Sequence, residues 1–150
     1  MTVVRVSEDT TLIVTGGDDN ALAFTRVRPG GTLPAEGPQC STLLIPKAHA
    51  SAITAITFVG FTSIRRGASH HLRFATSSND QRLKLWSTCI DLSKQGVAGL
   101  EIRRDSNVYT PVADVSSMDV LTDKSNKKKI VVCGVGMDIW SVNESDSGRF

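Results

Sequence analysis

Two short segments carry residue types that could do chemistry on a ligand. Ser69-His70-His71 offers two imidazoles, but adjacent side chains on a strand point to opposite faces, and no cysteine or carboxylate pair nearby completes a metal site. Gly134-Val135-Gly136 lacks the third glycine and the following helix of a dinucleotide-binding loop. Gly-x-Ser-x-Gly, HExxH and P-loop motifs are absent, and the acidic residues are not paired for acid–base work. The sequence therefore predicts a protein that is not an enzyme, with no metal, no cofactor and no catalytic residue.

Lysine and arginine gather at three places in a chain of formal net charge +2, and the clusters are Arg65-Arg66, Arg103-Arg104 and Lys127-Lys128-Lys129. Such a cluster is a solvated loop in one interpretation. In the other it faces an RNA backbone, where each phosphate contact adds salt-dependent affinity. The candidate RNA or partner contacts are Arg65, Arg66, Lys127, Lys128 and Lys129.

The composition, 40% hydrophobic and 21% charged, is that of an ordinary folded domain and favours neither disorder nor a membrane protein. No apolar run approaches the ~18 residues of a membrane helix, and MTVVRVSEDT lacks the pattern of a secretory signal. Cys40, Cys89 and Cys133 are an odd number without CxxC spacing, which favours structural or incidental cysteines. We therefore expect a cytosolic or nuclear setting, the cytoplasm first, and no membrane partner.

Short apolar runs bounded by Gly, Asp, Asn and Ser predict an all-β fold. The best helical candidate, Ile90–Leu100, is weakened by Gly96 and Gly99. Two long loops are expected, a Pro- and Gly-rich one at residues 28–40 and a second at residues 60–71. The expected strands are Val3–Ser7, Leu12–Thr15, Leu22–Val27, Thr42–Ile45, Ile53–Val59, Leu72–Ser77, Arg82–Ser87, Leu100–Arg103, Val115–Leu121, Ile130–Cys133 and Met137–Val142.

The chain contains an internal repeat. Residues 12–24 align without gaps on residues 73–85, and in both copies a threonine (Thr15, Thr76) stands four residues before a turn aspartate (Asp19, Asp80). A degenerate third copy, residues 130–140, keeps the strand, a Gly-containing turn and a second strand that ends in tryptophan. Repeats of this kind predict a series of similar β units, such as propeller blades.

The second copy and its flanks resemble a WD40 repeat. Ala48-His49 stands where that family usually has Gly-His, and Trp86-Ser87 stands where it has Trp-Asp. The resemblance implies a hydrogen-bonded structural tetrad of His49, Thr76, Asp80 and Trp86. The chemistry is sensible, because a buried indole N–H and a hydroxyl need partners, a histidine can bridge them, and an aspartate can fix the histidine. Such a tetrad stabilises a blade, since Thr76 would be locked inside it with no room for a substrate.

A narrower resemblance rests on residues 46–49 with 52–56, on residues 112–116, and on Val132-Cys133-Gly134-Val135-Gly136-Met137-Asp138-Ile139-Trp140. These segments look like the C-terminal end of the WD-repeat subunit that partners a tRNA 2′-O-ribose methyltransferase acting on the anticodon loop. The resemblance implies a non-catalytic scaffold whose partners are the methyltransferase subunit and tRNA. A generic WD40 adaptor for a ligase or trafficking complex, without an RNA role, is the alternative, because function lies on propeller surfaces and not in the blade pattern.

The resemblance implies about three four-stranded antiparallel blades, at residues 1–46, 47–103 and 104–150. A propeller needs roughly 4–8 blades to close. We therefore expect the remaining blades to come from sequence upstream, and we expect this chain alone to be unstable or to self-associate through open sheet faces.

Overall fold

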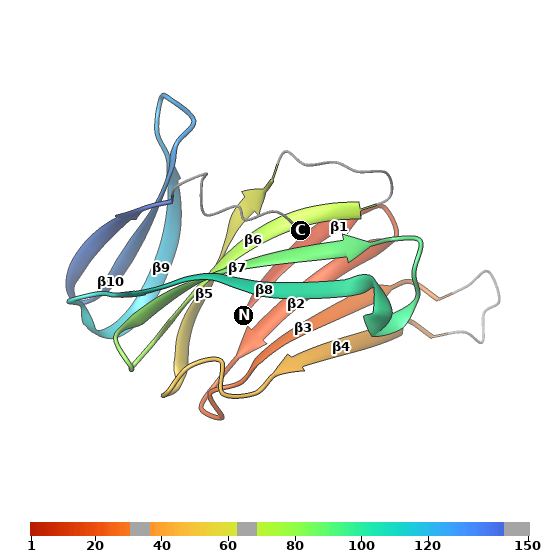
Figure 1. Cartoon of the computed structure of the whole chain (residues 1–150), viewed down its shortest axis with the longest axis horizontal. Coiled ribbons are helices and arrows are strands. Elements are labelled where there is room, and N and C mark those ends of the chain that lie inside the picture. The colour runs from red at the N-terminus through yellow and green to blue at the C-terminus, as the bar shows by residue number, and fades with distance from the viewer. Residues whose placement is uncertain (31–36, 63–68, 143–150) are drawn as a thin grey trace.

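The computed structural model describes residues 1–30, 37–62 and 69–142, and its architecture is all-β, as predicted (Figure 1). Three antiparallel sheets follow one another along the chain, and a short 3₁₀ helix, η1 (Gly96–Gly99), connects two strands of the second sheet. The strands of the first sheet are β1 (Thr2–Ser7), β2 (Thr10–Gly16), β3 (Leu22–Arg28) and β4 (Gln39–Ile45). The second sheet holds β5 (Ile53–Phe61), β6 (Ser69–Ser78), β7 (Arg82–Asp91) and β8 (Leu100–Tyr109), and the third holds β9 (Ala113–Thr122) and β10 (Lys128–Ser141).

The internal repeat is visible in the strand register. Thr15 pairs with Ala23 between β2 and β3, and Thr76 pairs with Lys84 between β6 and β7, which are the equivalent positions of the two copies. Each turn also has one non-glycine residue with a positive φ at the equivalent place. These residues are Asn20 (62°) and Gln81 (56°). The two hairpins are thus built to one plan.

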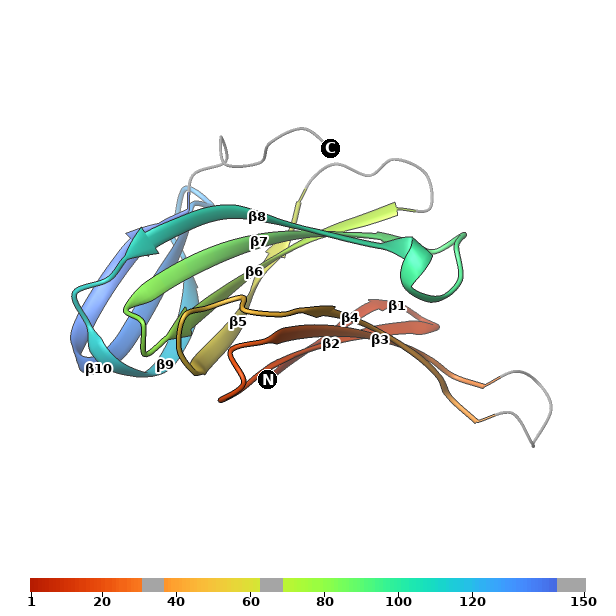
Figure 2. The same ribbon diagram turned by 60° about the horizontal axis from the view of Figure 1, so that its bottom comes forward.

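The third sheet depends on a strand that folds back on itself. A straight strand of the 14 residues of β10 would span roughly 46 Å. The backbone N–H of Val142 nevertheless donates to the carbonyl of Lys128 at 3.0 Å, so the two ends of β10 lie side by side (Figures 1 and 2). The reversal falls near Gly134, where a Cβ would lie 2.5 Å from the carbonyl oxygen of Asp114, and Gly136, whose φ is 109°.

Two expectations about the blades and loops are wrong in detail. The segment 104–150 does not form a four-stranded blade in the described residues: β8 runs on to Tyr109 within the second sheet, which leaves β9 and the doubled β10 for the third. Of the loop expected at residues 60–71, residues 60–61 belong to β5 and residues 69–71 to β6, and residues 63–68 lie outside the described part. In both cases cross-strand pairing carries the strand past the apolar run that marks it in the sequence. The loop expected at residues 28–40 lies between β3 and β4, and its residues 31–36 are outside the described part.

The hydrophobic core is divided between the two spaces that the three sheets enclose. Side chains of β1, β2 and β3 meet those of β6 and β7 in the first space, where the rings of Phe24 and Phe74 contact edge to face with centroids 5.8 Å apart. Leu83 and Leu85, on the opposite face of β7, meet Ile130 and Val132 of β10 in the second space. The second sheet is therefore covered on both faces, which explains why β6 and β7 are buried almost throughout while β2 alternates. Among the described residues, no helix is long and apolar enough to span a bilayer.

Candidate functional site

The four residues of the predicted tetrad come from three places around the second sheet. His49 lies in the link between β4 and β5, two residues after Lys47, whose φ of 53° marks a tight turn there. Thr76 lies on β6 and Trp86 on β7, and Asp80 occupies the turn that joins these two strands. The β6–β7 hairpin thus supplies three of the residues, and the incoming chain supplies the histidine.

The structure brings all four together in one hydrogen-bonded chain. The indole Nε1 of Trp86 donates to Oγ1 of Thr76 at 2.9 Å, and Oγ1 of Thr76 lies 2.8 Å from Nε2 of His49. Nδ1 of His49 lies 3.1 and 3.2 Å from the two carboxylate oxygens of Asp80. A carboxylate only accepts, so Nδ1 of His49 carries a hydrogen, and in the neutral imidazole Nε2 then accepts from the Thr76 hydroxyl. Every donor in this chain therefore points the same way, from Trp86 toward Asp80.

Asp80 closes the chain by fixing backbone on both sides of it. Its carboxylate accepts from the backbone N–H of Ala50 at 2.8 Å and from that of Arg82 at 2.9 Å. The first bond holds the link before β5, and the second shapes the turn before β7. A single side chain thus joins the histidine segment to the hairpin.

Burial and hydrogen bonding together set the protonation states of His49 and Asp80. His49 is 2% exposed and Thr76 is fully buried, and burial lowers the pKa of the imidazole although the charge of Asp80 acts to raise it. Burial acts to raise the pKa of Asp80, but the backbone N–H groups of Ala50 and Arg82, together with His49, outweigh it and lower that pKa. The lowered pKa of His49 favours the neutral imidazole, the form in which Nε2 accepts from the Thr76 hydroxyl.

Sequence reasoning missed Lys84, a buried cation beside the tetrad. Its ammonium group donates to the carbonyl of Ala48 at 2.5 Å, and the residue is only 7% exposed. Burial lowers the pKa of this lysine. The signal was present, because Lys84 stands two residues before Trp86 on the same strand and must share its buried face.

A second cluster that the sequence did not reveal surrounds Asp105. The carboxylate accepts from Oγ of Ser87, and Nε and Nη2 of Arg103 bind its Oδ1 at 3.1 and 2.8 Å. Nε of Arg73 lies 3.9 Å from Oδ2. Asp105 is a bulge residue, since Leu85 pairs with Ser106 and Trp86 with Arg104, which leaves Asp105 as the extra residue between them. Ser87, which follows Trp86 on β7, thus donates to a carboxylate.

The other two sheets carry separate side-chain hydrogen bonds and not a chain of four residues, in the part of the structure that is described. In the first sheet Asp19 accepts from the N–H of Ala21 at 3.1 Å, and Thr25, at the position that matches Trp86, bonds Thr42 through its hydroxyl at 2.9 Å. Beside the third sheet, the hydroxyl of Thr110, in the link between β8 and β9, donates to Asp138 of β10 at 3.2 Å. Packing must contribute most to the stability of these sheets.

The five basic residues predicted to contact RNA or a partner do not share one environment. Arg65 and Arg66 lie outside the described residues, and Lys127 is exposed in the turn before β10. The ammonium group of Lys128 donates to the carbonyl of Val59 on β5, and Lys129 is partly buried on β10. Lys128 therefore serves as a link between the second and third sheets, a role that its place in a lysine run did not suggest.

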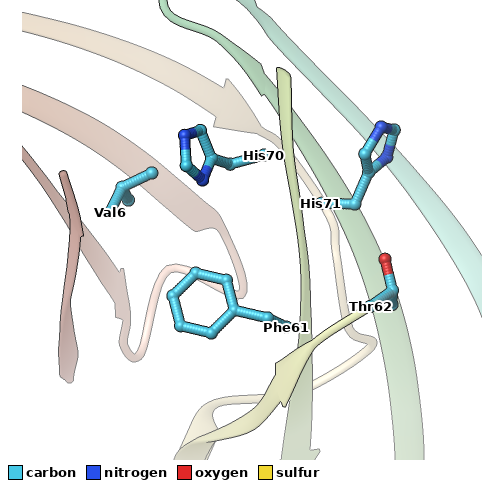
Figure 3. Close-up of a pocket in the computed structure, with 5 residues that line it drawn as sticks. All are labelled: Val6, Phe61, Thr62, His70 and His71. Carbon is cyan, nitrogen blue, oxygen red and sulfur yellow. The ribbon is translucent and has the colours of Figure 1, made fainter. Parts of the chain in front are cut away.

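The two histidines of the Ser69-His70-His71 segment lie on opposite sides of β6, as the alternation of a strand requires. They border a small cavity of about 110 Å³, where His70 is directed toward Val6 and Phe61 while His71 lies on the far side near Thr62 (Figure 3). Nε2 of His71 lies 3.8 Å from Sγ of Cys89, whose thiol pKa is raised by burial. Within the described ranges, no three His, Cys, Asp or Glu side chains gather as metal ligands would.

Comparisons with protein-family models, with curated proteins and with solved structures find no match to this chain. The fold itself defines an all-β protein of three antiparallel sheets stacked in chain order.

Replacing Thr76 by valine tests the tetrad without changing the volume of the side chain. Thr76→Val leaves the indole N–H of Trp86 without an acceptor and Nε2 of His49 without a donor, and each unsatisfied buried group costs about 1–3 kcal/mol. Urea unfolding should show this loss. The matched control Thr25→Val removes a partly exposed hydroxyl bond and should change the free energy of unfolding by less than about 0.5 kcal/mol. Equal effects of the two substitutions would contradict the tetrad's importance.

The neutral state of His49 predicts a loss of stability in mild acid. The folded pKa lies below the ordinary 6.5, so the unfolded chain takes up the proton first. The stabilisation is complete above about pH 6.5 and is lost as the pH falls from there through the lowered pKa. Unfolding free energies measured between about pH 8 and about pH 5 should fall in the native chain and fall less in His49→Gln. The same slope in both proteins would assign the effect to other groups.

Proposed function

We propose that this chain is a segment of a WD40-type β-propeller. The proposal depends mainly on the buried chain from Trp86 through Thr76 and His49 to Asp80, because its residue types, order and strand positions are those of the WD40 tetrad. Its role is to rigidify a four-stranded blade, and it leaves no room for a substrate at Thr76, which is fully buried. A binding scaffold without catalysis fits this arrangement.

The order of the sheets supports the same proposal. The first strands of consecutive sheets contact each other, β1 with β5 and β5 with β9. In a propeller the first strand of each blade lies nearest the central axis, so neighbouring first strands meet there. The sheets also stack in chain order with one core between each pair, as expected of a repeat protein (Figure 2).

The outer faces of the first and third sheets carry exposed apolar side chains, which favours further blades packing on them. Val3 and Leu44, both 55% exposed, lie on the face of the first sheet that is turned away from the core. Val135 and Met137 are 69% and 66% exposed and alternate along the returning limb of β10. Exposed apolar rows of this kind mark surfaces that are covered in the functional assembly. We assign them to blades outside these 150 residues.

The more specific proposal is a scaffold that positions tRNA for a partner 2′-O-ribose methyltransferase in the cytoplasm. It derives from the resemblance of residues 132–140 and their companion segments to the WD-repeat subunit of that enzyme. Because the partner enzyme would supply the cofactor site and the chemistry, the scaffold needs only binding surfaces. A generic WD40 adaptor remains the competing proposal, since the tetrad supports both equally.

The two proposals predict different effects of gene deletion on tRNA methylation. Deleting the gene should abolish 2′-O-methylation at the anticodon loop, and restoring the native gene should recover it. The tagged protein, purified at low salt, should bring down a methyltransferase subunit and tRNA. Unchanged methylation, with neither partner recovered, would overturn the tRNA proposal and leave the adaptor.

A further inference from the structure

The bulge at Asp105 changes which face of β8 its residues occupy. Residues directly opposite each other on neighbouring strands share a face. Arg104 lies opposite Trp86, Asn107 opposite Lys84, and Tyr109 opposite Arg82. Arg82, Lys84 and Trp86 occupy every second position of β7 and therefore share one face. Their three partners consequently all lie on one face of β8. Without the bulge, the odd spacing from Arg104 to Asn107 would place these two side chains on opposite faces.

The result is a row of exposed side chains along an edge strand. Figure 1 shows β8 as the outermost strand of the second sheet, beside β7. Its residues Arg104, Asn107 and Tyr109 are exposed, Tyr109 by 60%, and Arg82 on β7 is exposed beside Tyr109. We call these four residues the β8 strip.

The exposed charges of the β8 strip are those of Arg82 and Arg104, because the nearby carboxylates lie toward the other face or, like Asp80 with its side chain 9% exposed, are mostly buried. Asp105 and Glu101 lie toward the other face, where Asp105 binds Arg103 and Ser87. Asp80 is held by His49 and two backbone N–H groups. The positive charge of Arg104 also acts on nearby groups, since it contributes to the lowered pKa values of His49 and Lys84. Two guanidinium groups thus flank an exposed phenol ring and an amide.

This combination suits single-stranded RNA. Guanidinium groups pair with phosphate oxygens in a bidentate manner, an exposed aromatic ring stacks on an unpaired base, and an asparagine amide reads the edge of a base. Bulges are frequent next to functional sites because they re-aim side chains, and here a buried carboxylate holds the bulge in place. An acidic peptide could satisfy the arginines but would leave Tyr109 and Asn107 without a role.

We propose that the β8 strip binds single-stranded RNA, with Arg82 and Arg104 on phosphates and Tyr109 stacked on a base. The inference rests on the proposed tRNA function and names the surface that would carry it. A tRNA anticodon loop presents unpaired bases of the kind that such a strip receives.

The test is the affinity of the purified chain for a fluorescein-labelled single-stranded RNA of about 15 nucleotides, measured by anisotropy at several salt concentrations. Tyr109→Ala should weaken binding roughly 5- to 150-fold, the range for loss of one stacked base, and Tyr109→Phe should retain it. Arg104→Gln and Arg82→Gln should each weaken binding and reduce the slope of log affinity against log salt by about 0.7. Thermal melting of each variant establishes that it is folded.

Lys127→Gln is the matched control, because it removes one positive charge from an exposed turn outside the strip. It should leave both affinity and salt slope nearly unchanged. The inference is overturned if the native chain does not bind the RNA, if Lys127→Gln weakens binding as much as Arg104→Gln, or if Tyr109→Ala has no effect. Competition by a polyglutamate peptide that survives Tyr109→Ala would identify the strip as an acidic-peptide site.

Failure of this inference can be told apart from failure of the tRNA proposal. If strip variants bind RNA normally while gene deletion still abolishes methylation, RNA is held elsewhere and only the strip is excluded. If strip variants lose RNA binding but deletion leaves methylation intact, the strip stands and the methyltransferase partnership falls.

Discussion

The hydroxyl of Thr76 accepts from the indole of Trp86 and donates to the imidazole of His49, and it thereby ties β6 to β7 and to the link before β5. Removing this hydroxyl would leave the indole N–H of Trp86 and Nε2 of His49, both buried, without hydrogen-bond partners. Through His49 and Asp80 the same chain fixes the link before β5 and the turn before β7. The second sheet therefore has a rigid centre on which the first and third sheets pack.

Local pattern was enough to predict the strands and the repeat. The alternation of Leu12, Val14 and their neighbours marks β2, and the Thr–x3–Asp spacing marks the two equivalent hairpins, whose registers agree in the structure. The resemblance to a WD40 repeat supplied the four tetrad positions, which the structure brings within hydrogen-bond distance. Local and family patterns suffice here because hairpin register depends on residues close together in the chain.

Features that depend on pairing between distant residues were not predictable. The bulge at Asp105 exists only through the register of β7 against β8, and nothing within β8 marks it. Lys128 reads as part of a basic run, yet its partner is the carbonyl of Val59 on another sheet. The length of β8 was likewise underestimated, because residues 104–107 are all polar and carry no apolar alternation that would mark a strand. Long-range pairing thus explains why the predicted blade boundaries were wrong. It also creates the surface that we assign to RNA.

The central claim is most directly tested by hydrogen exchange of the indole N–H groups, because the chain contains two tryptophans. Trp86 is 4% exposed and bonded to Thr76, whereas Trp140 packs only partly buried against the second core. In nuclear magnetic resonance spectra, with Trp140→Phe to assign the signals, the indole of Trp86 should exchange only when the whole chain unfolds, far more slowly than that of Trp140. Exchange of the Trp86 indole as fast as, or faster than, that of Trp140 would show that the buried hydrogen-bonded chain does not hold the second sheet together.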